Sequence, residues 1–164
     1  MEKTSQASTS PEPISCPLQR DKLIPHFCEV IPSTLDALDA ILEQVIPVVK
    51  TMCCAPEEIE DVELVLQEAL ANAILHGNQS DPTKRVIVAG FCQCEADGGL
   101  LLVVRDEGVG FDPAQVPDPT SAKTIYSSHG RGIFLMRQFM DEVRFRSGGS
   151  EVELRKHGKP GCLP

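Results

Sequence analysis

The sequence predicts an α+β fold, a two-layer sandwich with helices on one face of a mixed, mainly antiparallel sheet. Two segments with helical spacing of apolar residues come early in the chain, and two β-hairpins come later. A third helical segment separates the two hairpins. Strands joined by hairpins form antiparallel pairs, and helices grouped apart from them are typical of an α+β domain.

The first expected elements are a short strand and a helix. The strand runs from Phe27 to Ile31 and ends at Pro32. Ser33 or Thr34 caps the helix that follows, whose apolar residues recur at helical spacing. Pro47 interrupts that pattern, so we expect a kink or a break there.

The second helix is expected to open at Pro56. Proline fits the first turn of a helix, and the two glutamates that follow favour its positive end. We expect this helix to end at Gly77 and Asn78, since these residue types adopt the left-handed turn that closes many helices.

Strands dominate the second half of the chain. Residues 85–94 and 100–105 are rich in β-formers and flank a turn-forming stretch, which predicts a hairpin. Residues 106–132 have little periodicity, and so long a loop inside a compact domain is usually functional or mobile. A helix and a final hairpin complete the expected fold, at residues 133–140, 142–146 and 151–155.

Length and charge limit the function. The 164 residues fit one domain, and a net charge of −9 disfavours direct binding to nucleic acid, which needs a basic face. No apolar run approaches the roughly 20 residues that span a bilayer, and the N-terminal residues lack the apolar stretch of a signal peptide. We therefore expect a cytoplasmic protein, without membrane attachment, whose partners are proteins or small molecules.

The expected domain organisation has three parts. Residues 1–24 are rich in Ser, Thr, Pro and Gln, which predicts a flexible N-terminal tail. Residues 25–158 form the folded domain, and residues 159–164 form a short C-terminal tail.

The cysteines predict reduced, buried thiols. Their number, seven, is odd, and no CxxC pair occurs. Cys53 and Cys54 are adjacent, while Cys92 and Cys94 are two residues apart and would share one face of a strand. These spacings favour thiols over a metal site or a structural disulfide.

A polar stripe marks the second helix. In QEALANAILHGN, residues 67–78, Glu68, Asn72 and His76 recur every four residues and so advance by only about 40° around the axis. The Asn72 oxygen can complete the shell of a phosphate-bound magnesium ion, and Glu68 can orient or deprotonate a nucleophile nearby. A solvated polar face explains the stripe equally well, and His76 favours a local hydrogen bond at the helix end.

Two glycine motifs follow. In DEGVG, Asp106 leaves an apolar strand, where a carboxylate can accept a hydrogen bond from an exocyclic amine, and Gly108 and Gly110 allow a close backbone approach. In SHGRGIFLM, Gly130 and Gly132 open a helix whose free N–H groups suit phosphate. Each motif alone also describes an ordinary turn or a loop-to-helix junction.

Together, and in this order, the three motifs resemble the Bergerat-fold (GHKL) ATPases. Within that superfamily the chain is most similar to the bacterial anti-sigma-factor serine/threonine kinases. The resemblance covers residues 27–156 and rests on four stretches: EALANAILHGN, VVRDEGVGFDP, GRGIFLMRQFMDEV and GGSEVELRK.

The resemblance implies roles for individual residues. It implies that Asn72 binds Mg²⁺, that Glu68 is the general base and that Asp106 hydrogen-bonds adenine. Gly108 and Gly110 are the glycines that accompany this aspartate. The remaining implied contacts to ATP come from the segment before and within the third helix: Lys123, Gly130, Arg131 and Gly132.

The resemblance also implies a reaction and partners. The γ-phosphoryl group of ATP passes to a serine of a STAS-domain anti-sigma-factor antagonist, leaving ADP, and the kinase, a homodimer, also sequesters a sigma factor. Two features depart from the family pattern: Ser128 and His129 precede the lid glycines, and Arg131 lies between them where a small or apolar residue is more usual. These departures concern the rate of transfer more than nucleotide binding.

Two other functions remain open from the sequence. One is a nucleotide-dependent binding module that sequesters a regulatory partner without significant kinase activity. The other is the catalytic domain of a histidine kinase, which the short lid and the lack of a dimerising helical hairpin with a phosphoacceptor histidine disfavour.

Overall fold

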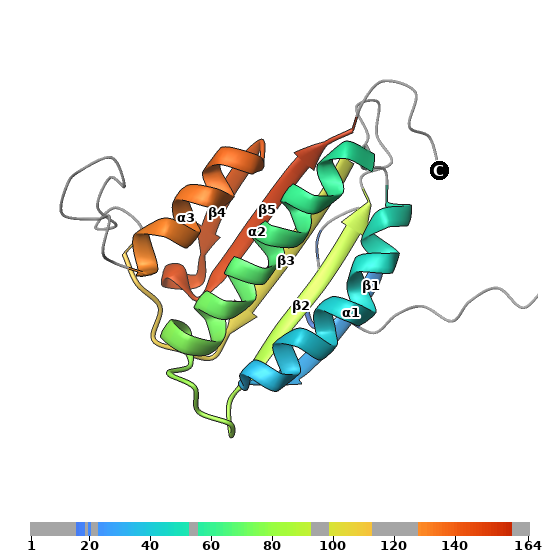
Figure 1. The fold of residues 1–164 in the computed structure, drawn as a ribbon. Helices are drawn as coiled ribbons and strands as arrows, with labels where there is room; N and C mark the ends of the chain where they lie inside the picture. The colour runs from blue at the N-terminus through green and yellow to red at the C-terminus, as the bar shows by residue number, and fades with distance from the viewer. Residues whose placement is uncertain are drawn as a thin grey trace, which may run out of the picture.

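The protein folds as one antiparallel sheet covered on one face by three helices (Figure 1). This computed structural model describes residues 16–18, 20, 23–52, 56–92, 99–112 and 128–158. The predicted α+β two-layer architecture is confirmed, and every neighbouring pair of strands is antiparallel.

Five strands form the sheet in the order β1-β2-β3-β5-β4. The connection from β3 through α3 to β4 crosses over, so β5 lies between β3 and β4, and the C-terminal hairpin extends the sheet by two strands. The strands are β1 (Ile24–Pro32), β2 (Arg85–Cys92), β3 (Gly99–Asp106), β4 (Glu142–Arg146) and β5 (Glu151–His157).

The helical layer lies over this sheet, with α2 between α1 and α3 (Figure 1). A 3₁₀ turn, η1, leads into α2, a single π-helical turn, η2, continues it, and the 3₁₀ turn η4 joins β4 to β5. The bounds are α1 (Leu35–Thr51), η1 (Pro56–Glu58), α2 (Ile59–Asn72), η2 (Ala73–Gly77), α3 (Ser128–Phe139) and η4 (Ser147–Gly149).

Helix α1 starts as predicted but does not break at Pro47. The Thr34 hydroxyl caps it by accepting a hydrogen bond from the backbone N–H of Ala37 at 3.4 Å. The expectation of an interruption was wrong, since the helix continues to Thr51. Val45 and Val49 are buried on either side of the proline, and their packing offsets the backbone hydrogen bond that proline removes.

The main core lies between the helices and the sheet. Helices contribute buried residues such as Leu66 and Leu70, and the central strands contribute Leu102 and Leu154, all fully buried. Alternate residues of β3 point to the opposite face, where Leu101 and Val103 belong to a second, smaller apolar cluster.

The end of the second helix differs from the prediction. Gly77 and Asn78 do not form the left-handed turn, because Asn78 has a φ of −87° and is completely buried. The left-handed residues are Gln79 and Ser80, with φ of 57° and 56°. The π-turn shifts the exit of the chain, so the turn comes two residues later than the sequence pattern indicates.

The prediction of reduced thiols was wrong for one pair. Cys16 and Cys28 form a disulfide, while Cys92 is buried and takes no part in a disulfide. Sequence spacing could not show this pairing, because it depends on the chain before β1 folding back onto the sheet. Leu18 of that segment is completely buried, although it belongs to the stretch expected to be a tail. The three-part domain division stays a prediction.

Candidate functional site

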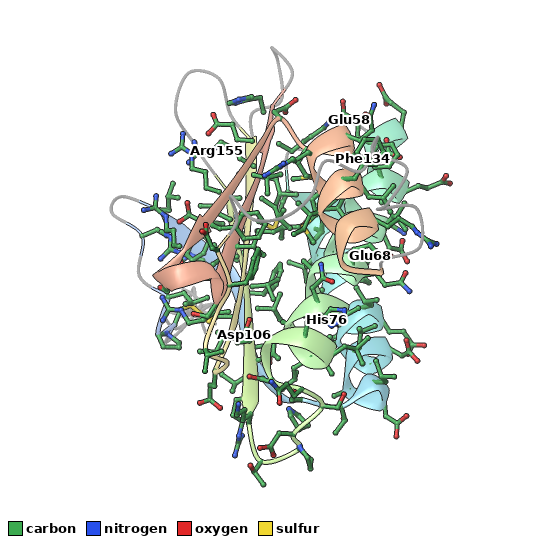
Figure 2. All side chains as sticks on the ribbon, turned by 90° about the vertical axis from the view of Figure 1, so that its left-hand side faces the viewer. Glu58, Glu68, His76, Asp106, Phe134 and Arg155 are labelled. Carbon is green, nitrogen blue, oxygen red and sulfur yellow. A yellow bond between two sulfur atoms is a disulfide. The ribbon has the colours of Figure 1, made fainter. Side chains whose placement is uncertain are left out.

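The polar stripe of α2 faces the start of α3. Glu68 and Asn72 are half-buried, one turn apart, and His76 follows in the π-turn. Figure 2 shows Glu68 in the helical layer close to the first turn of α3, and Asp106 in the sheet layer. The stripe is therefore not a freely solvated face at its first two positions.

Gly132 brings α3 against this stripe. A Cβ atom added to Gly132 would lie 2.8 Å from Oε2 of Glu68 and 3.0 Å from Nδ2 of Asn72. These separations are too short for a side chain unless its neighbours move, so glycine is the residue that permits this approach. The carboxylate, the amide and the glycine backbone thus converge on one small region.

Asp106 lies where β3 ends, beside the last residue of the π-turn. A side chain on Gly77 would overlap the Asp106 carboxylate, so the glycine makes room for it. Oδ1 of Asp106 accepts a hydrogen bond from the backbone N–H of Gly108 at 2.7 Å. This bond fixes the carboxylate with its remaining acceptor positions open to a ligand.

Partial burial raises the pKa of Asp106 above its ordinary value of 3.8. The Gly108 N–H and the positive charge of Lys84 oppose this effect by stabilising the carboxylate. Asp106 is the site carboxylate whose pKa is raised, as expected for a group held out of bulk water.

The glycines after Asp106 allow two close backbone approaches. A side chain on Gly108 would overlap the carbonyl group of Gly77, and Gly110 has a φ of 76°. Directly after it, the N–H of Phe111 donates to the carbonyl oxygen of Gly148 at 2.9 Å. The DEGVG loop is thus packed against η2 at one end and against η4 at the other.

Asn78 is a site-supporting residue that sequence reasoning missed. Its side-chain N–H donates to the carbonyl oxygen of Arg85 at 2.9 Å, and its Oδ1 accepts from the N–H of Glu107 at 2.8 Å. Asn78 therefore ties the helix end to β2 and to the DEGVG loop. An asparagine after a helix-end glycine was the available signal, but it also fits an ordinary helix cap.

The predicted phosphate-binding glycines lie inside α3 rather than before it. The helix begins at Ser128, so Gly130 is in its first turn and Gly132 follows, with the exposed Arg131 between them. Only the first four N–H groups of a helix lack an intrahelical acceptor, so Gly130 can offer its N–H to an anion while Gly132 lies one residue beyond. Lys123 lies outside the described residues.

The donor set at Asn72 suits a hard cation held mainly by other ligands. Within the described ranges, no group of three or more His, Cys, Asp or Glu side chains could hold a metal ion alone. An amide oxygen beside one carboxylate matches Mg²⁺ that takes its other ligands from phosphates and water. The residues present therefore fit a magnesium–nucleotide complex.

The two halves of the site share one helix. Asn72 faces Gly132 at one point, and Gly77 faces Asp106 five residues later, about 7 Å along the axis. The three sequence motifs are thus brought together along α2 and η2. The groups that suit phosphate and Mg²⁺ lie at one end, and the Asp106 carboxylate, which can accept a hydrogen bond from an amine, lies at the other. Among the described helices, none is both long enough and apolar enough to cross a membrane.

Comparison with known families agrees with this geometry. A family profile described as a histidine kinase-like ATPase domain matches residues 31–156, which include every described site residue.

Individual relatives give the same result. The chain is 38% identical over 107 residues to the anti-sigma F factor of Geobacillus thermodenitrificans, covering 62% of this chain and 70% of the relative. It is 37% identical over 107 residues to the anti-sigma F factor of Geobacillus kaustophilus, covering 62% of this chain and 70% of the relative. It is 35% identical over 107 residues to the anti-sigma F factor of Priestia megaterium, covering 62% of this chain and 71% of the relative. The chain therefore belongs to the ATP-binding family of histidine kinase-like ATPase domains that includes these anti-sigma F factors.

Proposed function

We propose that this protein is an ATP-dependent serine protein kinase and anti-sigma factor. It sequesters a sigma factor and phosphorylates a serine of a STAS-domain antagonist. The observation that carries the proposal is the convergence of Glu68 and Asn72 on Gly132, with Asp106 of β3 facing Gly77 further along the same helix. The relatives named anti-sigma F factor support the choice of partner.

Asp106 holds the base of the nucleotide. Its ionised carboxylate accepts a hydrogen bond from the exocyclic amine of adenine, while Gly108 fixes its other oxygen. Gly108 and Gly110 lack side chains, so the backbone after β3 packs closely on Gly77 and Gly148 and holds Asp106 at the base site.

The phosphates lie at the opposite end. Asn72 offers its Oδ1 to Mg²⁺, and the free N–H groups of the first turn of α3, that of Gly130 among them, face the β- and γ-phosphates. Arg131 and Lys123 add positive charge there. Magnesium bound with ATP offsets the phosphate charge that develops during transfer.

Glu68 acts on the protein substrate. Its carboxylate accepts the proton of the serine hydroxyl as the serine oxygen forms a bond to the γ-phosphorus and the bond to the β-phosphate oxygen breaks, releasing ADP. Its place beside Asn72 positions the base next to the metal-bound phosphates. We propose that the protein works in the cytoplasm as a homodimer.

A phosphotransfer assay tests this function. Purified protein is incubated with labelled ATP, Mg²⁺ and a STAS-domain antagonist, and label on serine is followed. Loss of a positioned general base typically costs about 10²–10⁴-fold, so Glu68→Gln should lower the rate by that factor. Nucleotide affinity should change by less than about 2-fold, since Glu68 does not hold the base or the metal.

Glu63→Gln is the matched control, because Glu63 is an exposed glutamate on the same helix. It should transfer phosphate at the wild-type rate. Full activity of Glu68→Gln would remove Glu68 as the base. No labelling by the wild-type protein, together with co-elution with a sigma factor in gel filtration, would instead favour the sequestering module without kinase activity.

A further inference from the structure

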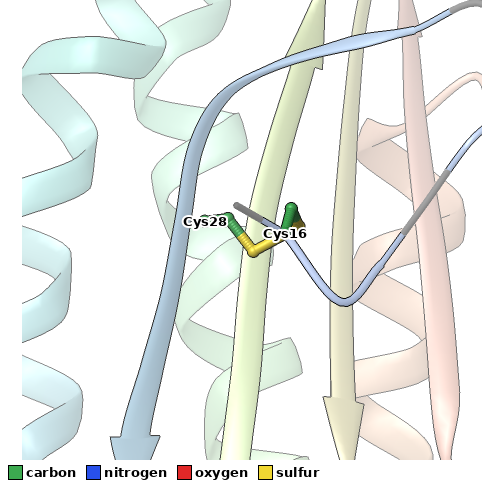
Figure 3. The surroundings of a disulfide bond; sticks show 2 residues. All are labelled: Cys16 and Cys28. Atoms are coloured by element: carbon green, nitrogen blue, oxygen red, sulfur yellow. A yellow bond between two sulfur atoms is a disulfide. The ribbon is translucent and has the colours of Figure 1, made fainter. Parts of the chain in front are cut away.

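A short N-terminal segment lies on the face of the sheet opposite the helices. We call it the strap and define it as residues 16–18, 20 and 23. Figure 3 shows Cys16 in this segment and Cys28 on β1, joined across the strands with the helices behind. The strap covers a surface that the helical layer leaves open.

The strap buries an apolar cluster. Leu18 is completely buried and packs with Phe91 of β2 and with Leu101 and Val103 of β3, each at most 3% exposed. Leu23 and Cys16 also pack against this cluster. Because these strand residues face away from the main core, removing the strap would expose them to water.

Arg20 adds a polar anchor. Its guanidinium contacts Glu151 at 2.5 Å and Glu153 at 2.8 Å, and both carboxylates are almost fully buried. Glu151 also pairs with Arg105, and Glu153 with Arg146 at 2.8 Å. Both carboxylates thus keep one arginine partner each when Arg20 leaves, which makes release of the strap less costly than full loss of a buried ion pair.

The covalent anchor is the Cys16–Cys28 disulfide. Its Cα atoms are 5.6 Å apart, inside the range that disulfides adopt. Both cysteines are half-buried, so a small thiol can reach the bond, whereas Cys92 is buried. The bond joins the strap to the edge strand of the sheet.

We propose that Cys16 and Cys28 form a reversible redox-modification site that locks the strap on the sheet. A dithiol reduces the bond: one of its thiolates attacks a cystine sulfur, its second thiol resolves the mixed disulfide, and two cysteine thiols remain while the dithiol becomes a cyclic disulfide. A low-molecular-weight disulfide such as oxidised glutathione restores the bond by the reverse exchange.

After reduction, the described residues hold the strap by noncovalent contacts, which are the packing of Leu18, Leu23 and Cys16 and the ion pairs of Arg20. The closed loop no longer restricts the chain, so the strap leaves the sheet more often and exposes the apolar cluster. Disulfides in reducing compartments are mostly transient and redox-sensing, which matches a bond that is accessible and lies outside the main core. This inference does not depend on the kinase proposal.

Peptide mapping of the full chain tests the bond directly. Trypsin cleaves after Arg20 and Lys22, which lie between the two cysteines, so the disulfide would join peptide 4–20 to peptide 23–50. After oxidation with oxidised glutathione, the mass of the joined pair is expected, and dithiothreitol should convert it into two separate peptides. Absence of the joined pair after oxidation would overturn the proposal.

Melting and dye binding test the strap. Dithiothreitol should lower the Tm of the oxidised wild-type protein by about 5 °C or more, as loss of a closed loop predicts, and increase the fluorescence of an apolar-surface dye several-fold. Cys16→Ser should behave like the reduced protein and not respond to dithiothreitol. Cys92→Ser, the matched control, should respond as the wild type does. Unchanged Tm and dye signals on reduction of the wild type would contradict the locking role.

Discussion

Asp106 combines two opposing requirements. Burial raises its pKa and so favours the neutral acid, whereas a strong, charge-assisted hydrogen bond from adenine needs the carboxylate. The Gly108 N–H, 2.7 Å from Oδ1, reconciles them by stabilising the charged form without occupying the whole carboxylate. Gly77 leaves room for the Asp106 carboxylate and Gly108 donates a hydrogen bond to it, so these two glycines determine how easily this side chain ionises.

The raised pKa of Asp106 predicts a pH dependence of nucleotide binding. ATP affinity should fall on acidification, starting above pH 3.8, the ordinary aspartate pKa, because protonation replaces the charged acceptor by a neutral acid that accepts a weaker hydrogen bond. Asp106→Asn should weaken binding by about 1.5–3 kcal/mol and should flatten this profile. Calorimetric titration of ATP from neutral to mildly acidic pH measures both effects. A wild-type affinity and pH profile in the Asp106→Asn protein would exclude Asp106 from the base site.

The same pKa shift affects stability with a defined sign. The folded protein holds the Asp106 proton more tightly than the unfolded chain does. Its contribution to the free energy of unfolding is therefore fully present below the unfolded pKa of 3.8 and is lost as the pH rises through the raised folded value. At neutral pH the buried carboxylate thus costs stability that binding of a ligand can offset.

At the scale of elements, the contact between α2 and α3 defines the phosphate end of the site. The prediction placed two glycines before a helix, whereas the helix already begins at Ser128 and contains them. Whether the first turn of α3 forms its helical hydrogen bonds depends on how this turn packs against α2. Local sequence does not encode that packing. Gly132 is therefore both a helix residue and a position where an added Cβ would crowd Glu68 and Asn72.

Gly132→Ala should separate activity from stability. The added methyl group would lie 2.8 Å from Oε2 of Glu68, which can move away because it is the end of a flexible side chain. A displacement of the base by about 1 Å can cost up to 10²-fold in rate, so we expect a loss of roughly 10- to 100-fold in phosphotransfer. The Tm should stay equal or rise, since alanine favours helix over glycine.

Gln138→Ala is the control for this substitution, because Gln138 is exposed on the same helix. It should leave both the rate and the Tm unchanged. A Gly132→Ala protein with full activity would show that α3 does not need this close contact during transfer.

At the scale of the whole molecule, few polar residues join the helical layer to the sheet in the part of the chain that the structure describes. Asn78 is the buried one at the end of the α2–η2 helix, where it bonds the backbone of Arg85 and of Glu107. The site lies between these layers, so the relative position of Asp106 and Asn72 depends on this connection.

Asn78→Ala should therefore lower both stability and nucleotide affinity. It leaves one carbonyl and one N–H of two part-buried hydrogen bonds without their partner, each costing at most about 1–3 kcal/mol, so we expect a loss of roughly 2–4 kcal/mol in the free energy of unfolding. Urea denaturation measures it, with Gln67→Ala on the exposed side of α2 as control. A loss no larger than that of the control would show that water replaces the amide at no cost.

Much of the architecture followed from sequence pattern because it depends on local chemistry. Helical spacing located α1 and α2, and β-rich segments located the strands of both hairpins within a few residues. The three motifs were found because their residue types have strong chemical preferences. That the three motifs lie together was inferred from family resemblance. The predicted helix-end turn at Gly77 and the predicted break at Pro47 were wrong, because tertiary packing overrode the local conformational preferences of these residues.

The sequence by itself determined the element types, the family and the residues of the three motifs, since these depend on periodicity and on side-chain chemistry. Only the tertiary structure decided that Gly132 lies beside Glu68 and Asn72, that Asn78 joins the two layers, and that Cys16 pairs with Cys28. These contacts join residues that lie far apart along the chain or depend on how an element packs, and no local pattern records the packing that brings them together.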